Sequence, residues 1–128
     1  MPKRVLETPN APNALGPYSV AIQAGGFVFV SGQVGIDPST GERAPDDVAA
    51  QTRQIMENLK VILGDSGLTM HDVAKTTIFL TDMKDFPTVN DVYGRYFEDE
   101  PPARSTVEVA ALPGGFLVEI EVIAARSY

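Results

Sequence analysis

The hydrophobic pattern of this chain switches repeatedly between two periods, and that alternation limits the folds open to it. Short runs with alternating apolar residues are typical of β-strands, whereas residues 48–63 and 86–97 place apolar side chains at helical spacing. Pro101 and Pro102 follow the second helical run, and a helix cannot continue through them. The pattern therefore predicts three strands, a helix, a strand, a second helix and two final strands.

Residues that favour turns separate the predicted strands. Gly25 and Gly26 form a two-residue hairpin turn between residues 20–24 and the run Phe27–Val30. That run is apolar at every position, which predicts a strand buried on both faces. The other predicted strands cover residues 4–7, 72–83, 103–109 and 116–125.

Each predicted helix has a candidate cap. Asp46 or Asp47 precedes the first helix and Asp85 precedes the second, and a carboxylate at that position can accept from the free amides of the first turn. Gly64 or Gly67 is placed to end the first helix, because glycine adopts the left-handed conformation at little cost.

The order of elements predicts a single α+β domain over residues 1–128. Each helix links two strands, which indicates parallel pairing by right-handed crossovers within a mixed sheet. If both helices cover one face of that sheet, the other face meets solvent or another subunit. Phe27, Phe29 and Val30, together with the apolar residues of the last strands, favour another subunit, so we expect a homo-oligomer.

Composition and charge exclude several classes of function. The net charge of −7 disfavours nucleic-acid binding, which needs a basic surface. With no cysteine there is no disulfide, thiolate nucleophile or cysteine-ligated zinc, and the single His71 leaves no histidine cluster for a transition metal. The first residues lack an apolar signal segment and no run has transmembrane length, so we expect a cytoplasmic protein without a membrane partner.

Charged residues on the last two predicted strands are the main candidates for chemistry. Arg104 stands near the start of one strand, and Glu119 and Glu121 lie on the next strand along the chain. If the two strands are neighbours, these side chains converge. One interpretation is a structural ion pair or a solvated sheet face. The other is a site in which the guanidinium grips a small carboxylic acid and a free glutamate holds or deprotonates a water molecule.

Other candidates have a structural alternative as well. Gly32, after Ser31 at the end of an apolar strand, either allows a ligand close to the backbone or marks a bulge. Tyr18 follows a loop and either lines a pocket or packs half-buried. Asn90, within the second helix, either bonds a neighbouring loop or makes a polar contact in a cleft. No Walker loop, GxGxxG or Ser-His-Asp set is present, which leaves acid–base chemistry without a cofactor.

Blocks of sequence along nearly the whole chain resemble the RidA/YjgF family of reactive intermediate deaminases. The most specific pair is PARSTVEVAALP with EIEVIA; the other blocks are GPYS, VFVSGQVGIDPSTGE, QTRQIMENLKVIL, GLTMHDVAKTTIFLTDMKDF and VNDVY. The resemblance implies a chorismate-mutase-like α+β fold, with a mixed six-stranded sheet and two helices on one face. It also implies a homotrimer with active sites between subunits, working without cofactor or metal.

The activity implied by the resemblance is hydrolysis of reactive 2-imino and enamine acids, such as 2-aminoacrylate/2-iminopropanoate and 2-iminobutanoate, to 2-oxo acids and ammonia. Arg104 is similar to the family's carboxylate-binding arginine, and Glu119 to the glutamate that orients the attacking water. Thr106 stands where many members have cysteine, and main-chain groups there and at Gly32 contact the substrate. The remaining pocket positions implied by the resemblance are Tyr18, Ser31 and Asn90.

Three other functions remain open at this point. The same fold can serve as a non-enzymatic trimer that binds a carboxylic metabolite or a partner protein. A role as a ribonuclease or translation inhibitor, also attached to the family, is disfavoured by the acidic composition. Specialisation toward another enamine, such as aminoacrylate from pyrimidine breakdown, depends on pocket shape, which the sequence does not give.

Overall fold

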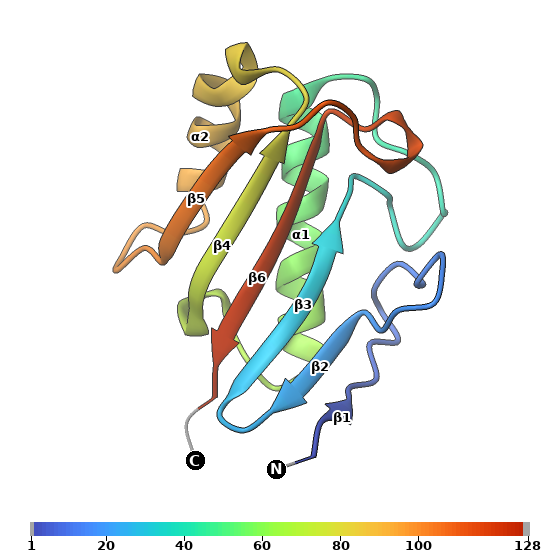
Figure 1. The fold of residues 1–128 in the computed structure, drawn as a ribbon, viewed down its shortest axis with the longest axis vertical. Coiled ribbons are helices and arrows are strands. Elements are labelled where there is room, and N and C mark those ends of the chain that lie inside the picture. Colours follow the sequence, from blue (N-terminus) through green and yellow to red (C-terminus); the bar gives the residue numbers. More distant parts are fainter. Residues whose placement is uncertain (1, 127–128) are drawn as a thin grey trace.

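The computed structural model describes residues 2–126, and these form one mixed sheet with two α-helices against it (Figure 1). The predicted α+β class and order of elements are confirmed, while residues 1, 127 and 128 of the predicted domain lie outside the described residues. The bounds are β1 Arg4–Val5, β2 Ala21–Ala24, β3 Phe27–Gln33, α1 Val48–Asp65, β4 Val73–Leu80, α2 Phe86–Gly94, β5 Ala103–Glu108 and β6 Val118–Ala125.

The strand order in the sheet is β1-β2-β3-β6-β4-β5, which corrects one expectation from the sequence. The strands that carry Arg104 and Glu119 are not neighbours, because β4 lies between β5 and β6. The crossover through α2 sets β5 parallel to β4 at the edge of the sheet. The last strand, β6, then pairs antiparallel with both β3 and β4 and fills the gap between them.

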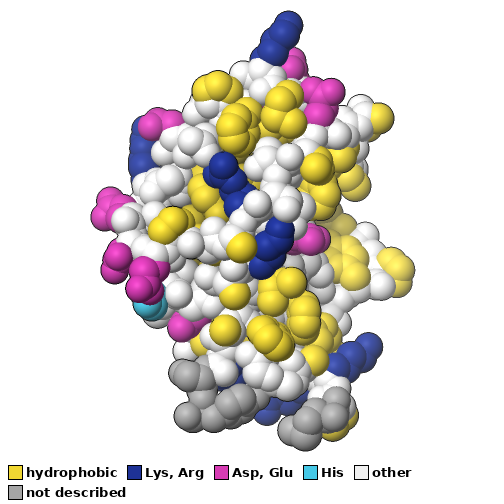
Figure 2. Space-filling model, turned by 60° about the vertical axis from the view of Figure 1, so that its left-hand side comes forward, with side chains coloured by type: hydrophobic (Ala, Val, Ile, Leu, Met, Phe, Trp, Pro, Cys, Tyr) yellow, Lys and Arg dark blue, Asp and Glu magenta, His cyan; other side chains and the backbone are white. Residues whose placement is uncertain are grey.

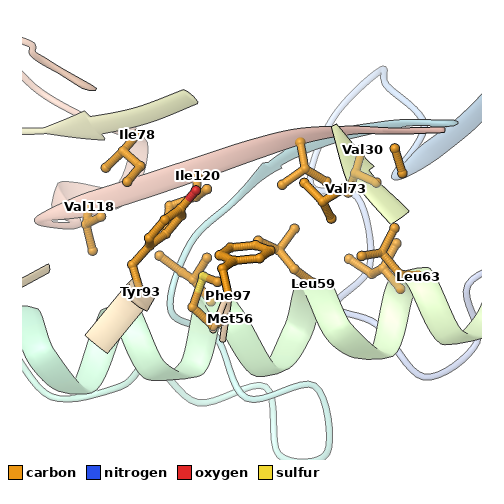
Figure 3. Packing of buried hydrophobic residues seen from close by; sticks show 14 of the residues in the cluster. Val30, Met56, Leu59, Leu63, Val73, Ile78, Tyr93, Phe97, Val118 and Ile120 are labelled. Carbon is orange, nitrogen blue, oxygen red and sulfur yellow. The ribbon is translucent and has the colours of Figure 1, made fainter. Parts of the chain in front are cut away.

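Both helices pack on the same face of the sheet and enclose the hydrophobic core (Figures 1 and 3). On β6 alternate residues face this core, and all of them are buried: Val118, Ile120, Val122 and Ala124. Leu59, Ile62 and Leu63 meet them from α1 and are fully buried. Each such side chain contributes about 1.5–3 kcal/mol by leaving water, so the core fixes which face of every strand is outward.

The termini of α1 follow the predicted signals. The side chain of Asp47 accepts a hydrogen bond from the amide of Ala49, and Gly67 has a φ of +79° just after the helix. The amide of Leu68 donates to the carbonyl of Leu63 at 2.7 Å, which closes the last turn. Asp85 precedes α2 but makes no capping bond with its side chain.

The sheet face away from the helices is left uncovered by the chain and is partly apolar. Phe27 and Phe29 on β3 are 49% and 42% exposed, whereas Val28 and Val30 are buried in the core. The expectation that Phe27–Val30 is buried on both faces is therefore wrong for the single chain, because no layer covers its second face. Figure 2 brings forward the left-hand side of Figure 1, where α2 and β5 lie, and shows basic side chains among hydrophobic ones on that side of the molecule.

No helix within residues 2–126 combines the length and the apolar character needed to cross a membrane.

Candidate functional site

The guanidinium of Arg104 is held by α2. In the register of β4 and β5, Arg104 pairs with Thr76, whose side chain is buried and bonds the hydroxyl of Tyr93 at 2.7 Å. Arg104 thus faces the helices at the sheet edge. Its Nη1 donates to Oδ1 of Asn90 at 2.7 Å, and its guanidinium carbon lies 5.4 Å from the centre of the Phe86 ring and 5.2 Å from that of Tyr93. Asn90 therefore bonds the arginine, and not a loop.

Arg104 has no acidic partner within the described part of the chain. Among residues 2–126 the only ion pair is the exposed contact between Arg95 and Asp91, at 2.7 Å. The structural ion pair that the sequence left open for Arg104 is thus not formed within one chain. A guanidinium carries five N–H donors, and one bond to Asn90 leaves most of them available to a carboxylate.

Glu119 lies on the other face of the sheet. Its neighbours on β6, Val118 and Ile120, are buried against the helices, so Glu119 points to the uncovered side. It is half-buried there. Burial raises the pKa of the Glu119 carboxyl, and the nearby charge of Glu121 raises it further. A carboxyl with a raised pKa exchanges a proton more readily near neutral pH than an exposed glutamate does.

Gly32 makes room for Glu119. The pairing of β3 with β6 shifts between Val30 and Gln33, so Gly32 lies in a β-bulge. A Cβ atom built on Gly32 would come within 2.3 Å of Oε2 of Glu119, which makes a glycine necessary for this close approach. The bulge expected at this glycine is therefore present and brings the backbone against the carboxylate, while close approach of a ligand to Gly32 stays a prediction.

The bulge also positions Ser31. Its backbone amide donates to the carbonyl of Val20 at 2.9 Å, and its Oγ donates to the carbonyl of Ser19 at 2.6 Å. Nearby, Tyr18 is 49% exposed, and its hydroxyl accepts a hydrogen bond from the amide of Leu15 at 3.2 Å. Tyr18 is thus a loop residue with about half of its surface exposed, and it lines the cavity described next.

A cavity of about 500 Å³ brings these residues together. Four of the predicted positions line it: Tyr18, Ser31, Gly32 and Glu119. Glu121, also named from the sequence, lines it as well, whereas the sequence reasoning missed Pro113, Gly114 and Phe116. The Pro-Gly-Gly-Phe stretch before the last strand is the one signal that marks this wall, as a glycine-rich turn that ends in an aromatic residue.

The remaining predicted positions lie elsewhere. Arg104, Asn90 and Thr106 are not part of this cavity, because β5 is at the sheet edge and their side chains are on the helix side. The Oγ1 atom of Thr106 is buried and has no hydrogen-bond partner within residues 2–126. The candidate site therefore consists of two separate halves, an arginine half at the β5 edge and a glutamate half on the uncovered face.

No group of three or more His, Asp or Glu side chains within the described residues is arranged to hold a metal ion. The donors offered by the two halves are a guanidinium, a carboxylate, hydroxyls and backbone groups. They suit a small polar ligand with a carboxylate and a centre that reacts with water.

Comparison with known proteins gives consistent similarities. A model of the family described as endoribonuclease L-PSP matches residues 8–126. A mouse protein named 2-iminobutanoate/2-iminopropanoate deaminase is 47% identical over 124 residues, which are 97% of this chain and 92% of the mouse protein. A RutC family protein of Pyrococcus horikoshii is 52% identical over 95% of this chain and 97% of its own length. The crystal structure of Escherichia coli TdcF with bound serine superposes with a TM-score of 0.91 at 45% identity, covering 97% of this chain and 99% of TdcF.

Proposed function

This chain belongs to the endoribonuclease L-PSP family, which is also the RidA/YjgF family, and we propose that it hydrolyses 2-imino acids to 2-oxo acids and ammonia. The observation that carries the proposal is the guanidinium of Arg104, which is fixed by Asn90 but has no acidic partner within residues 2–126. The name of the mouse relative supports the same activity.

In this proposal Arg104 binds the carboxylate of the substrate. The planar guanidinium matches a carboxylate with two parallel hydrogen bonds, and a lysine offers no such fork. The bond to Asn90 fixes the plane of the guanidinium before the ligand arrives. The aromatic rings of Phe86 and Tyr93 flank the guanidinium. They add no acceptor strong enough to compete with the carboxylate of the substrate for its N–H donors.

We infer that the active site is completed between subunits of a homotrimer. Arg104 pairs with Thr76 and Glu119 pairs with Phe79, three residues further along β4, and the two side chains are on opposite faces. At ordinary strand spacings their backbones are roughly 14 Å apart, too far for one small imino acid within one chain. The uncovered face, with Phe27 and Phe29 exposed, is a suitable surface for subunit contact.

The proposed reaction needs only positioning and proton transfer. The protonated imine carbon is electrophilic, and the carboxylate of Glu119 orients a water molecule and takes one of its protons as the oxygen bonds to that carbon. The tetrahedral adduct then collapses: Glu119 returns the proton to the nitrogen, the C–N bond breaks and ammonia leaves, and the hydroxyl gives its proton to the Glu119 carboxylate as the carbonyl of the 2-oxo acid forms. Tyr18, Ser31 and main-chain groups at Gly32 and Thr106 hold the substrate in place.

A second candidate function is carboxylate binding without turnover. The E. coli TdcF structure has serine bound, and Arg104 would serve such a role equally well. A role in RNA binding is not favoured, because the net charge of −7 opposes contact with phosphates.

The test generates 2-iminopropanoate with an amino-acid oxidase and traps it with semicarbazide. The chain is expected to suppress the trapped product, and Arg104→Ala and Arg104→Lys are both expected to lose activity by roughly a hundredfold or more. Arg95→Ala, at an exposed arginine paired only with Asp91, is the matched control. Full activity in Arg104→Lys would exclude the proposed role of the fork. Saturable binding of 2-oxobutanoate without any turnover would favour the second candidate.

A further inference from the structure

The loop between β3 and α1 and the loop between β5 and β6 meet at the wall of the glutamate-side cavity. Arg43 of the first loop contacts the second loop at the surface. The guanidinium of Arg43 donates through Nη1 to the carbonyl of Gly114. Its guanidinium carbon lies 3.9 Å from the centre of the Phe116 ring, which is a close cation–π contact. Arg43 itself is exposed, so this contact is made at the surface and not within the core.

The ring of Phe116 is tightly packed between the turn at Gly114 and the guanidinium of Arg43. Phe116 is only 5% exposed, although it lines the cavity. Gly114 has a φ of +76°, and a Cβ atom there would lie 2.9 Å from the Phe116 ring and 3.4 Å from Nη1 of Arg43. The ring is thus held between the turn and the guanidinium in a single position.

Gln51 joins the same two loops from the inside. This residue of α1 is fully buried, its Oε1 accepts from the amide of Leu117 at 2.9 Å, and its Nε2 donates to the carbonyl of Pro45 at 3.2 Å. Arg43 and Gln51 therefore fix the wall from opposite sides. The cavity wall is preformed, and its width is set by where the ring of Phe116 is held.

This wall differs in chemistry from the rest of the cavity. Ser31, Gly32 and Glu119 supply polar groups, which the reacting imine and water use under the proposed function. Val34, Pro113 and Phe116 present apolar surface and offer no side-chain hydrogen bond to a ligand. When the polar residues bind the reacting end of a substrate, the side chain of that substrate lies against the apolar residues.

We propose that Phe116, held in place by Arg43, forms an apolar subsite that selects 2-imino acids with side chains larger than methyl. The inference rests on the proposed imine hydrolysis and identifies which substrates are preferred. Arg43 is a positioning residue, because it touches the ring and the turn but not the substrate. Each added methylene on the substrate side chain is expected to raise kcat/KM by roughly fourfold.

The test measures kcat/KM for imines made in situ from alanine, 2-aminobutanoate and leucine. In the unaltered chain the leucine-derived imine is expected to be preferred over the alanine-derived one by at least about tenfold. Arg43→Ala is expected to reduce that preference several-fold, because kcat/KM for the leucine-derived imine falls more than kcat/KM for the alanine-derived one. Arg53→Ala removes the same charge from an exposed position of α1 and should leave the preference unchanged.

The outcomes separate this inference from the proposed function. If Arg43→Ala hydrolyses every imine with the same preference as the unaltered chain, the proposed subsite is overturned and the proposed function is not. Hydrolysis of none overturns the proposed function, and calorimetry then tests the subsite by binding of 2-oxobutanoate and 4-methyl-2-oxopentanoate. Tighter binding of the larger acid, lost in Arg43→Ala, supports the subsite; equal binding of the two acids, or no binding, overturns it.

Discussion

Arg104 and Glu119 lie on opposite faces of one sheet, with β4 between the strands that carry them. Neither residue has an ionic partner within residues 2–126. A site that uses both must take one from each of two chains, as proposed above.

Two inactive variants should therefore restore activity together. Arg104→Ala and Glu119→Gln are each expected to be inactive alone. Co-expressed chains should form mixed oligomers in which a site takes its arginine from one chain and its glutamate from the other. With random assembly about a quarter of the sites are intact. The measurement is imine hydrolysis by the co-purified oligomer, and an inactive mixture would refute the shared site.

Asn90→Asp is expected to raise KM more than it lowers kcat. A carboxylate at this position forms an ion pair with Arg104, whose Nη1 is already 2.7 Å from the side chain, and competes with the carboxylate of the substrate. Steady-state kinetics on an imine series checks this. The control is Asn90→Ser, which removes the amide without adding a charge, and an equal KM in the two variants would contradict the explanation.

The raised pKa of Glu119 makes a prediction for stability. At pH values above that pKa the folded chain holds a charge that burial disfavours, whereas below the unfolded value, near 4.5, the carboxyl is neutral in both states. Glu119→Gln should therefore raise Tm at pH 7, and the gain should shrink as the pH falls. Thermal melts across this range test it, with Glu108→Gln, at an exposed carboxylate, as the comparison. An increase in Tm that becomes larger as the pH falls would contradict the prediction.

Gly32→Ala is expected to abolish activity with little effect on folding. The new Cβ would overlap Oε2 of Glu119, and the flexible glutamate can turn away while the backbone stays. Kinetics and a thermal melt on the same sample test both parts. Gly94→Ala adds a methyl group where nothing lies within 4 Å and should keep full activity. Normal turnover by Gly32→Ala would mean that the present position of Glu119 is not required.

Phe29→Asp should dissociate the proposed oligomer and remove activity. The ring is 42% exposed on the uncovered face, so the change costs the single chain little but introduces a charge into a subunit contact. Light scattering after gel filtration gives the mass of the particle. Val5→Asp makes the same change at a side chain that is 60% exposed on β1. An unchanged mass for Phe29→Asp would place the subunit contact elsewhere.

The sequence was sufficient for the local structure because each local feature depends on nearby residues. The periods of the apolar residues gave both helices, and the cap at Asp47 and the turn at Gly25 are set within a few residues. The faces of the last strands did not follow: Val30 and the apolar residues of the last strand were expected to face another subunit, whereas the structure buries them against the helices and leaves Glu119 on the uncovered side.

Long-range placement was not available from such patterns. Nothing in the last two strands shows that β6 enters between β3 and β4, so the predicted convergence of Arg104 and Glu119 was wrong within one chain. The contact of Arg43 with Gly114 joins residues 71 positions apart, and no spacing rule connects them. The sequence therefore identified the chemical groups better than their arrangement.

The side-chain amide of Gln51 links the cavity wall to the protein interior. Because it is buried on α1 and holds the carbonyl of Pro45 and the amide of Leu117, any repacking of that helix also displaces the loops that it anchors. Under the proposed subsite, packing around α1 and substrate preference are therefore coupled in this chain. A substitution that tightens the core around α1 is expected to move the cavity wall as well, although the substituted residue never touches the substrate.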